Sequence, residues 1–343
     1  MGPQRHDEIG AAPTTEKGDR MNQVRLGRSE LEVSRVAFGT WELSGDWGPT
    51  DAEAMIAAIR HAADQGVTFF DTAQAYGFGT SERLLGEALR GRSRDELVIA
   101  TKGGLRRSGP DVVRDASAHQ IVSGVEDSLR ALAMDYVDLY QIHWPDPTTP
   151  IEETASAIAK LIKEGKVRHV GVSNFDTAQV AAFSAILPVE TVQPPYSLFR
   201  REIERELLPY SVAHDIGVLV YGPLAHGLMG GDLGPATRFA DSDWRSTSAI
   251  FQGQDFERNL AVVTELGDLA RREHITLGQL AIAWTLSNPA VQLAIVGMSN
   301  LRHVDEAIAA SEVELDTSTM TQVDDNMQGA VEVVLPGPGA GTA

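Results

Sequence analysis

Cysteine is absent from the 343-residue chain, which excludes disulfide bonds, thiolate metal sites and cysteine nucleophiles. Basic residues are scarce, because 29 lysines and arginines stand against 48 aspartates and glutamates, a formal net charge of −19. This charge argues against a nucleic acid or an anionic membrane as a partner. No run approaches the roughly 20 apolar residues of a membrane span, and residues 1–20 lack the apolar core of a signal peptide. We therefore expect a soluble, cytoplasmic protein.

Apolar residues make up 43% of the chain, which is enough for one large domain with a closed core. Residues 1–20 are polar, and we predict that they form a disordered leader. Residues 331–343 end in PGPGAGTA and are predicted to be a flexible tail. Residues 21–330 are expected to form a single domain, since nothing between them indicates a second one.

Short apolar runs alternate with helical patterns of about 10 to 15 residues, which is typical of repeated βα units around a parallel sheet. The runs are VAFG from 36, FFDTA from 69, VIATK from 98, VDLYQIH from 137, HVGVSN from 169, TVQPPYS from 191, GVLVYG from 217 and LAIVG from 293. Their number predicts a (β/α)₈ TIM barrel. Residues 24–33 are predicted to form an N-terminal β-hairpin, and a long loop separates strands 7 and 8.

Two helix starts agree with this arrangement. Thr50 with Glu53, and Asp176 with Gln179, have the spacing of capping boxes, in which a side chain at the helix start and another three residues later exchange hydrogen bonds with the backbone. Both fall between a predicted strand and the next one.

Titratable residues end three successive predicted strands: Asp71 the second, Lys102 the third and His143 the fourth. Each has an ordinary explanation. Asp71 could cap a turn, Lys102 could extend to solvent, and His143 could be a core histidine with its hydrogen bonds satisfied. In a barrel, however, the carboxyl ends of the strands meet around one axis, where catalytic groups gather. We expect the three side chains, with Tyr76 from the turn after Asp71, to converge.

Convergence would give acid–base chemistry. An aspartate keeps a neighbouring lysine charged, and the lysine is expected to lower the pKa of Tyr76 toward neutral pH, so that the phenol acts as a general acid. His143 could orient a carbonyl oxygen. This set has a proton donor but no source of electrons, so a redox cofactor is implied.

The chain resembles the aldo-keto reductases from about Val24 to about Glu314. The resemblance is carried by VAFGTW, TFFDTAQAYG, SERLLGEAL, VIATK, VDLYQIHWPD, VRHVGVSNF, VQPPYSL, VYGPLAHGL and VGMSN. It implies a catalytic tetrad of Asp71, Tyr76, Lys102 and His143. It also implies reversible hydride transfer from a reduced nicotinamide to an aldehyde or ketone, with a small-molecule carbonyl or alcohol as substrate.

The resemblance further implies a set of cofactor contacts. Ser173, Asn174 and Gln193 would hold the nicotinamide carboxamide, and Tyr221 would stack on its ring. The insertion 225–256 and the segment before it would cover the pyrophosphate through Gly222, Leu224, Gly227 and Arg245. Beyond the last strand, Gly297, Ser299, Arg302, His303 and Glu306 would surround the adenosine phosphate.

The family's usual basic residue is replaced by glycine at position 297, which weakens the signal for NADP. No acidic residue stands at 297–304 to select a ribose hydroxyl, so NADP(H) is favoured and NAD(H) remains possible. Trp41, Trp47 and Trp144 lie near the expected barrel mouth and could wall a substrate pocket or serve as packing.

Three alternatives stay open. Lys102 could form a Schiff base in an aldolase, although the other polar residues would then lack roles. The chain could be a non-catalytic nicotinamide-binding sensor or regulatory subunit. A metal hydrolase on the same barrel would need a cluster of ligands that His143 does not have, and we predict no metal site.

Overall fold

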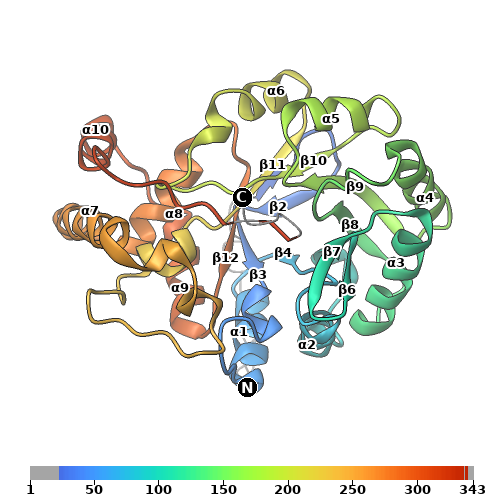
Figure 1. The fold of residues 1–343 in the computed structure, drawn as a ribbon, viewed down its shortest axis with the longest axis horizontal. Helices are drawn as coiled ribbons and strands as arrows, with labels where there is room; N and C mark the ends of the chain where they lie inside the picture. Colours follow the sequence, from blue (N-terminus) through green and yellow to red (C-terminus); the bar gives the residue numbers. More distant parts are fainter. Residues whose placement is uncertain (1–22, 336, 339–343) are drawn as a thin grey trace, which may run out of the picture.

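Eight parallel strands close into a barrel in the computed structural model, which describes residues 23–335, 337 and 338 (Figure 1). The strands are β3 (Val36–Gly39), β4 (Phe69–Asp71), β5 (Val98–Gly103), β8 (Val137–Ile142), β9 (Val167–Ser173), β10 (Thr191–Gln193), β11 (Gly217–Tyr221) and β12 (Leu293–Gly297). They follow one another around the barrel in chain order, and β12 pairs with β3 to close it. The predicted (β/α)₈ barrel is confirmed. The predicted leader, residues 1–20, lies outside the described residues.

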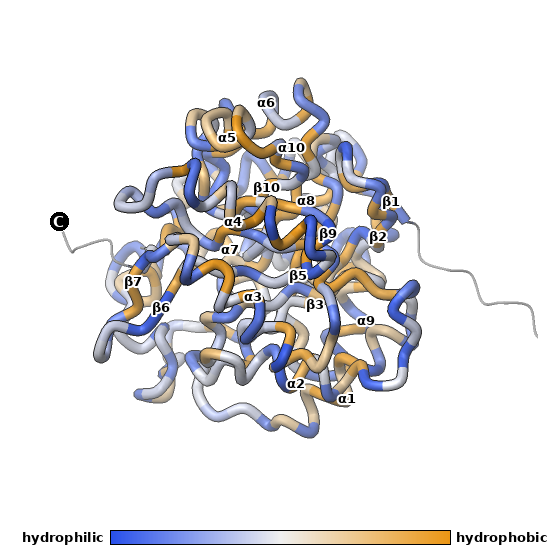
Figure 2. The backbone as a smooth tube through the Cα atoms, turned by 90° about the vertical axis from the view of Figure 1, so that its right-hand side faces the viewer, coloured by the Kyte–Doolittle hydropathy of each residue, from blue (hydrophilic) through white to orange (hydrophobic). Residues whose placement is uncertain are grey.

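Helices surround the strands, as Figure 1 shows. They are α1 (Ala52–Asp64), α2 (Thr80–Leu89), α3 (Ala118–Leu132), α4 (Ile151–Lys163), α5 (Thr177–Ser184), α6 (Leu207–Ala213), α7 (Gly253–Arg272), α8 (Leu277–Ser287), α9 (Leu301–Ala310) and α10 (Thr317–Asn326). In α4 the residues at helical spacing, Ala155, Ile158 and Leu161, are buried, whereas Lys160 and Lys163 stay exposed. Figure 2 shows the same division across the molecule, with hydrophobic segments inside and hydrophilic segments at the outer loops.

The period of two along the strands decides which side chains enter the barrel. Val98 and Ala100 of β5 belong to the core inside the barrel, whereas Ile99 belongs to the layer between strands and helices. Lys102 continues the inward series at the end of the strand. In β4, Phe69 points inward and Phe70 outward, so Asp71 also faces the axis. The alternation therefore directs the side chains of Asp71 and Lys102 into the barrel interior.

An antiparallel hairpin of β1 (Gln23–Arg25) and β2 (Glu32–Ser34) precedes the barrel, as predicted. Its Leu26 and Val33 are buried in the same interior core, so the hairpin packs against the end of the barrel opposite the strand carboxyl ends. Gly27 has φ +54°, and a Cβ there would lie 2.2 Å from the backbone nitrogen of Gly217. Only glycine fits this turn.

A second hairpin, β6 (Leu105–Ser108) with β7 (Asp111–Arg114), was not predicted. It follows β5 directly, and the exposed residues 106–108 give it no apolar alternation. The long connection between β11 and β12 holds three short 3₁₀ turns, η4 (Ala225–Gly230), η5 (Trp244–Ser246) and η6 (Ala249–Phe251), and then α7 and α8.

The predicted helix starts had mixed outcomes. Asp176 and Gln179 form the expected capping box at α5. At α1, however, the cap is Asp51, whose carboxylate accepts from the backbone N–H groups of Glu53 and Ala54, while the Thr50 hydroxyl donates to the Glu42 carbonyl. One carboxylate oxygen of Asp51 accepts both N–H groups, and its negative charge is favoured at a helix N-terminus, which a threonine hydroxyl does not supply.

Part of the segment predicted as a tail makes defined contacts. Val333 is buried and donates its backbone N–H to the Phe199 carbonyl, and Arg114 donates to the Pro338 carbonyl. None of the helices among the described residues is both long enough and apolar enough to cross a membrane.

Candidate active site

A buried ion pair lies at the carboxyl ends of β4 and β5. Lys102 Nζ donates to Asp71 Oδ2 at 2.5 Å, to the Thr72 carbonyl at 3.0 Å and to the Tyr76 hydroxyl at 3.2 Å. Lys102 and Asp71 are 1% and 2% exposed. Because all three protons of the ammonium are directed at oxygen atoms, Lys102 serves as the hub that joins the aspartate to the tyrosine.

Two amides support the second oxygen of the carboxylate. Gln193 Nε2 donates to Asp71 Oδ1 at 2.8 Å, and Gln141 Nε2 lies 3.5 Å from the same atom. The sequence predicted that Gln193 contacts a nicotinamide, but its amide nitrogen is engaged by Asp71. Gln141 was missed, although it occupies the inward series of β8 two residues after Leu139.

The expectation that Lys102 lowers the pKa of Tyr76 is wrong in this structure. Burial raises the pKa of Tyr76 well above its ordinary value of 10, and the negative charge of Asp71 adds to the effect. Burial also lowers the pKa of Lys102, which the Asp71 carboxylate opposes. Desolvation of the phenolate therefore outweighs the nearby ammonium, and Tyr76 holds its proton at neutral pH.

His143 stands beside Tyr76, with ring centroids 5.7 Å apart and planes at 82°. Burial lowers its pKa well below 6.5, and the charge of Lys102 lowers it further. The imidazole is therefore neutral near pH 7 and keeps one N–H that can donate to an oxygen atom. The predicted tetrad is thus brought together in space.

A hydrogen-bond chain links the ends of β9, β10 and β11. Asn174, at φ +62°, donates to the His143 carbonyl at 2.9 Å and accepts from the Tyr221 hydroxyl at 2.8 Å. The Ser173 hydroxyl donates to the Gln193 carbonyl at 2.8 Å. The predicted nicotinamide contacts therefore form one connected rim beside the tetrad.

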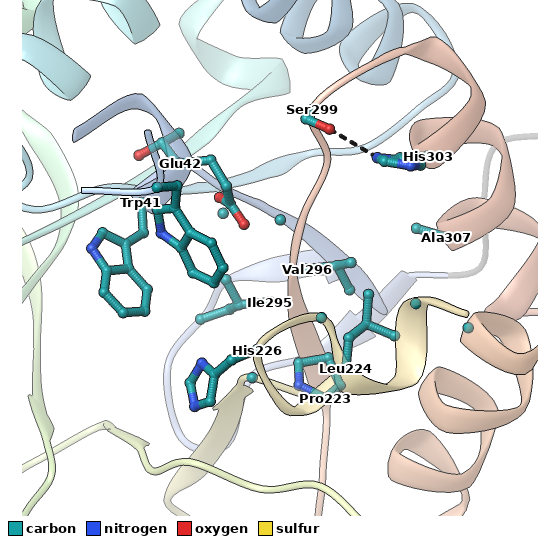
Figure 3. Close-up of a pocket in the computed structure, with 18 of the residues that line it drawn as sticks. Trp41, Glu42, Pro223, Leu224, His226, Ile295, Val296, Ser299, His303 and Ala307 are labelled. Carbon is teal, nitrogen blue, oxygen red and sulfur yellow. Dashed lines mark hydrogen bonds between the residues drawn. The ribbon is translucent and has the colours of Figure 1, made fainter. Parts of the chain in front are cut away.

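A cavity of about 550 Å³ opens next to Asp71 and Tyr76 and runs to the start of α9. Its lining includes many of the predicted cofactor residues: Tyr221, Gly222, Leu224, Gly227, Gly297, Ser299, Arg302, His303 and Glu306. Figure 3 shows Trp41 and His226 on one side of it and Ser299 and His303 on the other. The volume is ordinary for a small-molecule site.

The far end of the cavity is polar. Ser299 Oγ and His303 Nδ1 are 3.0 Å apart, and Asn300 caps α9 by accepting the backbone N–H of His303. Arg302 donates to Glu306 at 3.3 Å. The first turn of α9 directs backbone N–H groups here, a setting that favours an anion.

Aromatic rings wall the near end. Trp41 stacks on Tyr76 at 6.3 Å and on Trp244 at 5.8 Å, and it meets Trp47 edge-on at 5.0 Å. Trp244 and His226 were not predicted, because they stand in the insertion, which has no periodicity to follow. The structure does not bring Trp144 into this cavity. Its ring lies under the Arg114 guanidinium, 5.1 Å away.

Two loops meet across the cavity. Trp47 and Asp243 form an isolated antiparallel bridge, and the Trp244 N–H donates to the Asp46 carbonyl at 3.0 Å. Arg245, which the sequence placed near a pyrophosphate, lines the cavity and is held by Asp243 at 2.6 Å. The insertion is therefore a structured wall of the site.

Within the described residues, no group of three or more histidine and carboxylate side chains is arranged to hold a metal ion.

Comparison with known proteins agrees with this geometry. Residues 35–327 match the model of the Aldo/keto reductase family. The chain is 41% identical to the aldo-keto reductase YhdN of Bacillus subtilis, over 81% of this chain and 85% of that one. The glycerol dehydrogenase AKR11B4 from Gluconobacter oxydans superposes with a TM-score of 0.82 at 37% identity, covering 92% and 98% of the two chains. A crystal structure of an aldo-keto reductase from Klebsiella pneumoniae in complex with NADPH superposes with a TM-score of 0.70 at 31% identity. The match covers 89% of this chain and 94% of that chain.

Because the family model spans most of the chain and the relatives are aldo-keto reductases on the same barrel, the protein is an oxidoreductase that reduces carbonyl groups. The chain belongs to the aldo/keto reductase family. The Schiff-base aldolase and the non-catalytic sensor are not favoured by these findings.

Proposed function

We propose that the protein reduces a small aldehyde or ketone with NADPH, reversibly, and that Tyr76 supplies the proton. One observation carries the assignment of roles: Lys102 Nζ contacts both Asp71 and the Tyr76 hydroxyl inside a buried site that opens on a long cavity. A proton donor and a cofactor-sized space are thereby adjacent.

The cavity fits a dinucleotide in its chemistry. Its inner end reaches Asp71 and Tyr76 of the tetrad, and its outer end offers the Ser299 hydroxyl, the Arg302 guanidinium and the first turn of α9. We assign the nicotinamide end to Ser173, Asn174 and Tyr221, with the side-chain oxygen Oε1 of Gln193 as a further acceptor. When bound, the cofactor supplies the hydride.

Gly222, Leu224 and Gly227 line the middle of the cavity, where the pyrophosphate would lie. Ser299, Arg302 and His303 would contact the adenosine phosphate, with Glu306 next to them. The Klebsiella relative holds NADPH, and residues 297–304 carry Arg302 but no carboxylate. These observations favour NADP(H), with NAD(H) as the alternative.

Each member of the tetrad has a distinct task in this proposal. Tyr76 keeps its proton because its pKa is raised, and it donates the proton to the substrate oxygen as negative charge develops there. Lys102 donates to the Tyr76 oxygen and stabilises the phenolate that is left. Asp71 fixes Lys102, and neutral His143 orients the carbonyl oxygen.

Trp41 and Trp47 line the cavity, with Trp244 stacked on Trp41, and these rings support substrates with an apolar group beside the carbonyl. Trp144 faces Arg114 instead, so we assign it no contact with substrate in this conformation. A cytoplasmic location stays a prediction, which fractionation of expressing cells would test.

The test is Tyr76→Phe, assayed with NADPH and a panel of aliphatic and aromatic aldehydes. Loss of the phenol hydroxyl removes the general acid, so kcat should fall at least about 100-fold. The Kd for NADPH, measured by tryptophan fluorescence, should change little. Tyr136→Phe is the matched control, because Tyr136 packs between Arg94 and Arg168 away from the cavity. Wild-type rates in Tyr76→Phe would refute the assignment.

A further inference from the structure

Glu42 places a carboxylate in the middle of the cavity. It belongs to the short helix η1 (Trp41–Ser44) after β3, and its side chain lines the cavity. Figure 3 shows the carboxylate directed toward the segment that leads from Val296 to Ser299. A Cβ built on Gly297 would lie 1.6 Å from Glu42 Oε1. The carboxylate therefore fills the space above the end of β12.

This space lies between the two ends of the proposed dinucleotide site. Asp71 and Tyr76 line the cavity on one side of it, and Ser299 and His303 line it on the other. A dinucleotide that reaches both ends has to pass Gly297, and its pyrophosphate brings negative charge there.

No arginine in contact neutralises Glu42. Arg245 is the cation that acts on it, but the Arg245 guanidinium is engaged by Asp243 at 2.6 Å. Arg302, at the outer end, is paired with Glu306. No side chain of the described residues donates a hydrogen bond to the Glu42 carboxylate.

The other titratable groups around this position add negative charge. Asp51, Asp71, Asp232 and Glu306 also line the cavity, and Asp71 alone among them has a buried lysine partner. Tyr76 faces the same space, and Glu42 and Asp46 both raise the pKa of its phenol. His303 has a lowered pKa because of burial and the charge of Arg302. His226 also lines the cavity and is neutral near pH 7, because burial lowers its pKa to about 3. Arg245 is the cation whose charge acts on Glu42, and Asp243 already pairs with it, so little positive charge is left to offset a second negative charge beside Glu42.

We propose that Glu42 controls cofactor binding through its proton: the carboxyl is protonated in the complex with the dinucleotide and ionises when the dinucleotide leaves. This inference rests on the proposed function, since it concerns the same cavity. It adds that cofactor affinity depends on pH. Burial raises the pKa of Glu42 to about 7 in the free protein, with Arg245 opposing, so the change falls in the neutral range.

The experiment measures Kd for NADPH and for NADH by quenching of tryptophan fluorescence between pH 5.5 and 9. The wild-type Kd should be nearly constant below pH 6.5 and rise by up to about tenfold per pH unit above 7.5, because ionised Glu42 must take up a proton. NADH is included because it has no 2′-phosphate to titrate.

Glu42→Gln keeps the size of the side chain and removes the titration. Its Kd should vary less than about threefold over the same range and should be lower than that of the wild type at pH 8.5. Asp232→Asn is the matched control: it removes one carboxylate from the exposed rim of the same cavity and should keep the steep dependence. Thermal melts confirm that each variant is folded.

Calorimetry gives a second readout. At pH 8.5 in phosphate and in Tris, wild type should take up close to one proton per cofactor bound, and Glu42→Gln close to none. If Glu42→Gln shows the wild-type pH dependence and proton uptake, this inference is wrong and the proposed function survives. If neither nucleotide binds any variant at any pH, both are wrong.

Discussion

The buried pair of Lys102 and Asp71 predicts a large loss of stability when one partner is removed. Both side chains are almost completely buried, and Nζ and Oδ2 are 2.5 Å apart. In Lys102→Met the Asp71 carboxylate keeps the Gln193 amide as a donor but loses its counter-ion. An uncompensated buried charge costs about 3–5 kcal/mol.

The assay is urea unfolding at pH 7, followed by far-UV circular dichroism. Lys102→Met should lower the free energy of unfolding by about 3–5 kcal/mol. The double variant Lys102→Met with Asp71→Asn removes the orphaned charge and should recover more than half of the loss. Lys160→Met is the control, since Lys160 is an exposed residue of α4 and its pair with Glu164 is worth little. A loss below about 1 kcal/mol in Lys102→Met, or no recovery in the double variant, would refute the reasoning.

The remaining predictions concern the outer cavity and the charge on Glu42. Arg302→Ala should raise the Kd for NADPH by about tenfold, since a single charge-assisted hydrogen bond to the 2′-phosphate is lost, and should leave the Kd for NADH within about twofold. Equal changes of both Kd values in fluorescence titrations would mean that Arg302 does not contact the 2′-phosphate. Glu42→Gln should stabilise the fold at pH 8 but not at pH 4.5. The folded pKa of Glu42, about 7, exceeds the ordinary 4.5, so the protein loses stability as the pH rises from 4.5 through 7. We expect about 1–2 kcal/mol after allowing for partial exposure, and equal unfolding curves for both proteins at pH 8 would contradict it.

The barrel and the convergence of the tetrad could be predicted because both depend on strand periodicity. Asp71 and Lys102 each continue an inward series of apolar residues, and the ends of parallel strands meet around the axis. The contact of Tyr76 with Lys102 could be expected because Tyr76 lies in the turn directly after Asp71, and the family resemblance implied the same tetrad.

The parts that could not be predicted depend on loops or on solvation. Glu42 and His226 line the cavity from segments far apart in the sequence, and only their packing reveals it. The pKa of Tyr76 depends on how completely the ring is buried, which residue identity alone does not show. Trp144 was misplaced because its neighbour Arg114 belongs to the β6–β7 hairpin, which was not predicted.

The bridge between the loops at Trp47 and Asp243 has a consequence for kinetics. These loops follow β3 and β11, and β12 lies between those two strands in the barrel. The two loops are joined by the contacts Trp47–Asp243 and Asp46–Trp244. Together they enclose the part of the cavity that lies across the end of β12, where we place the dinucleotide. A dinucleotide can enter or leave only by passing lengthwise through the enclosed space or after the two loops separate. We therefore expect the rate at which the loops separate to limit entry and exit of the cofactor. The dissociation rate of the cofactor should increase when the Trp47–Asp243 bridge is weakened.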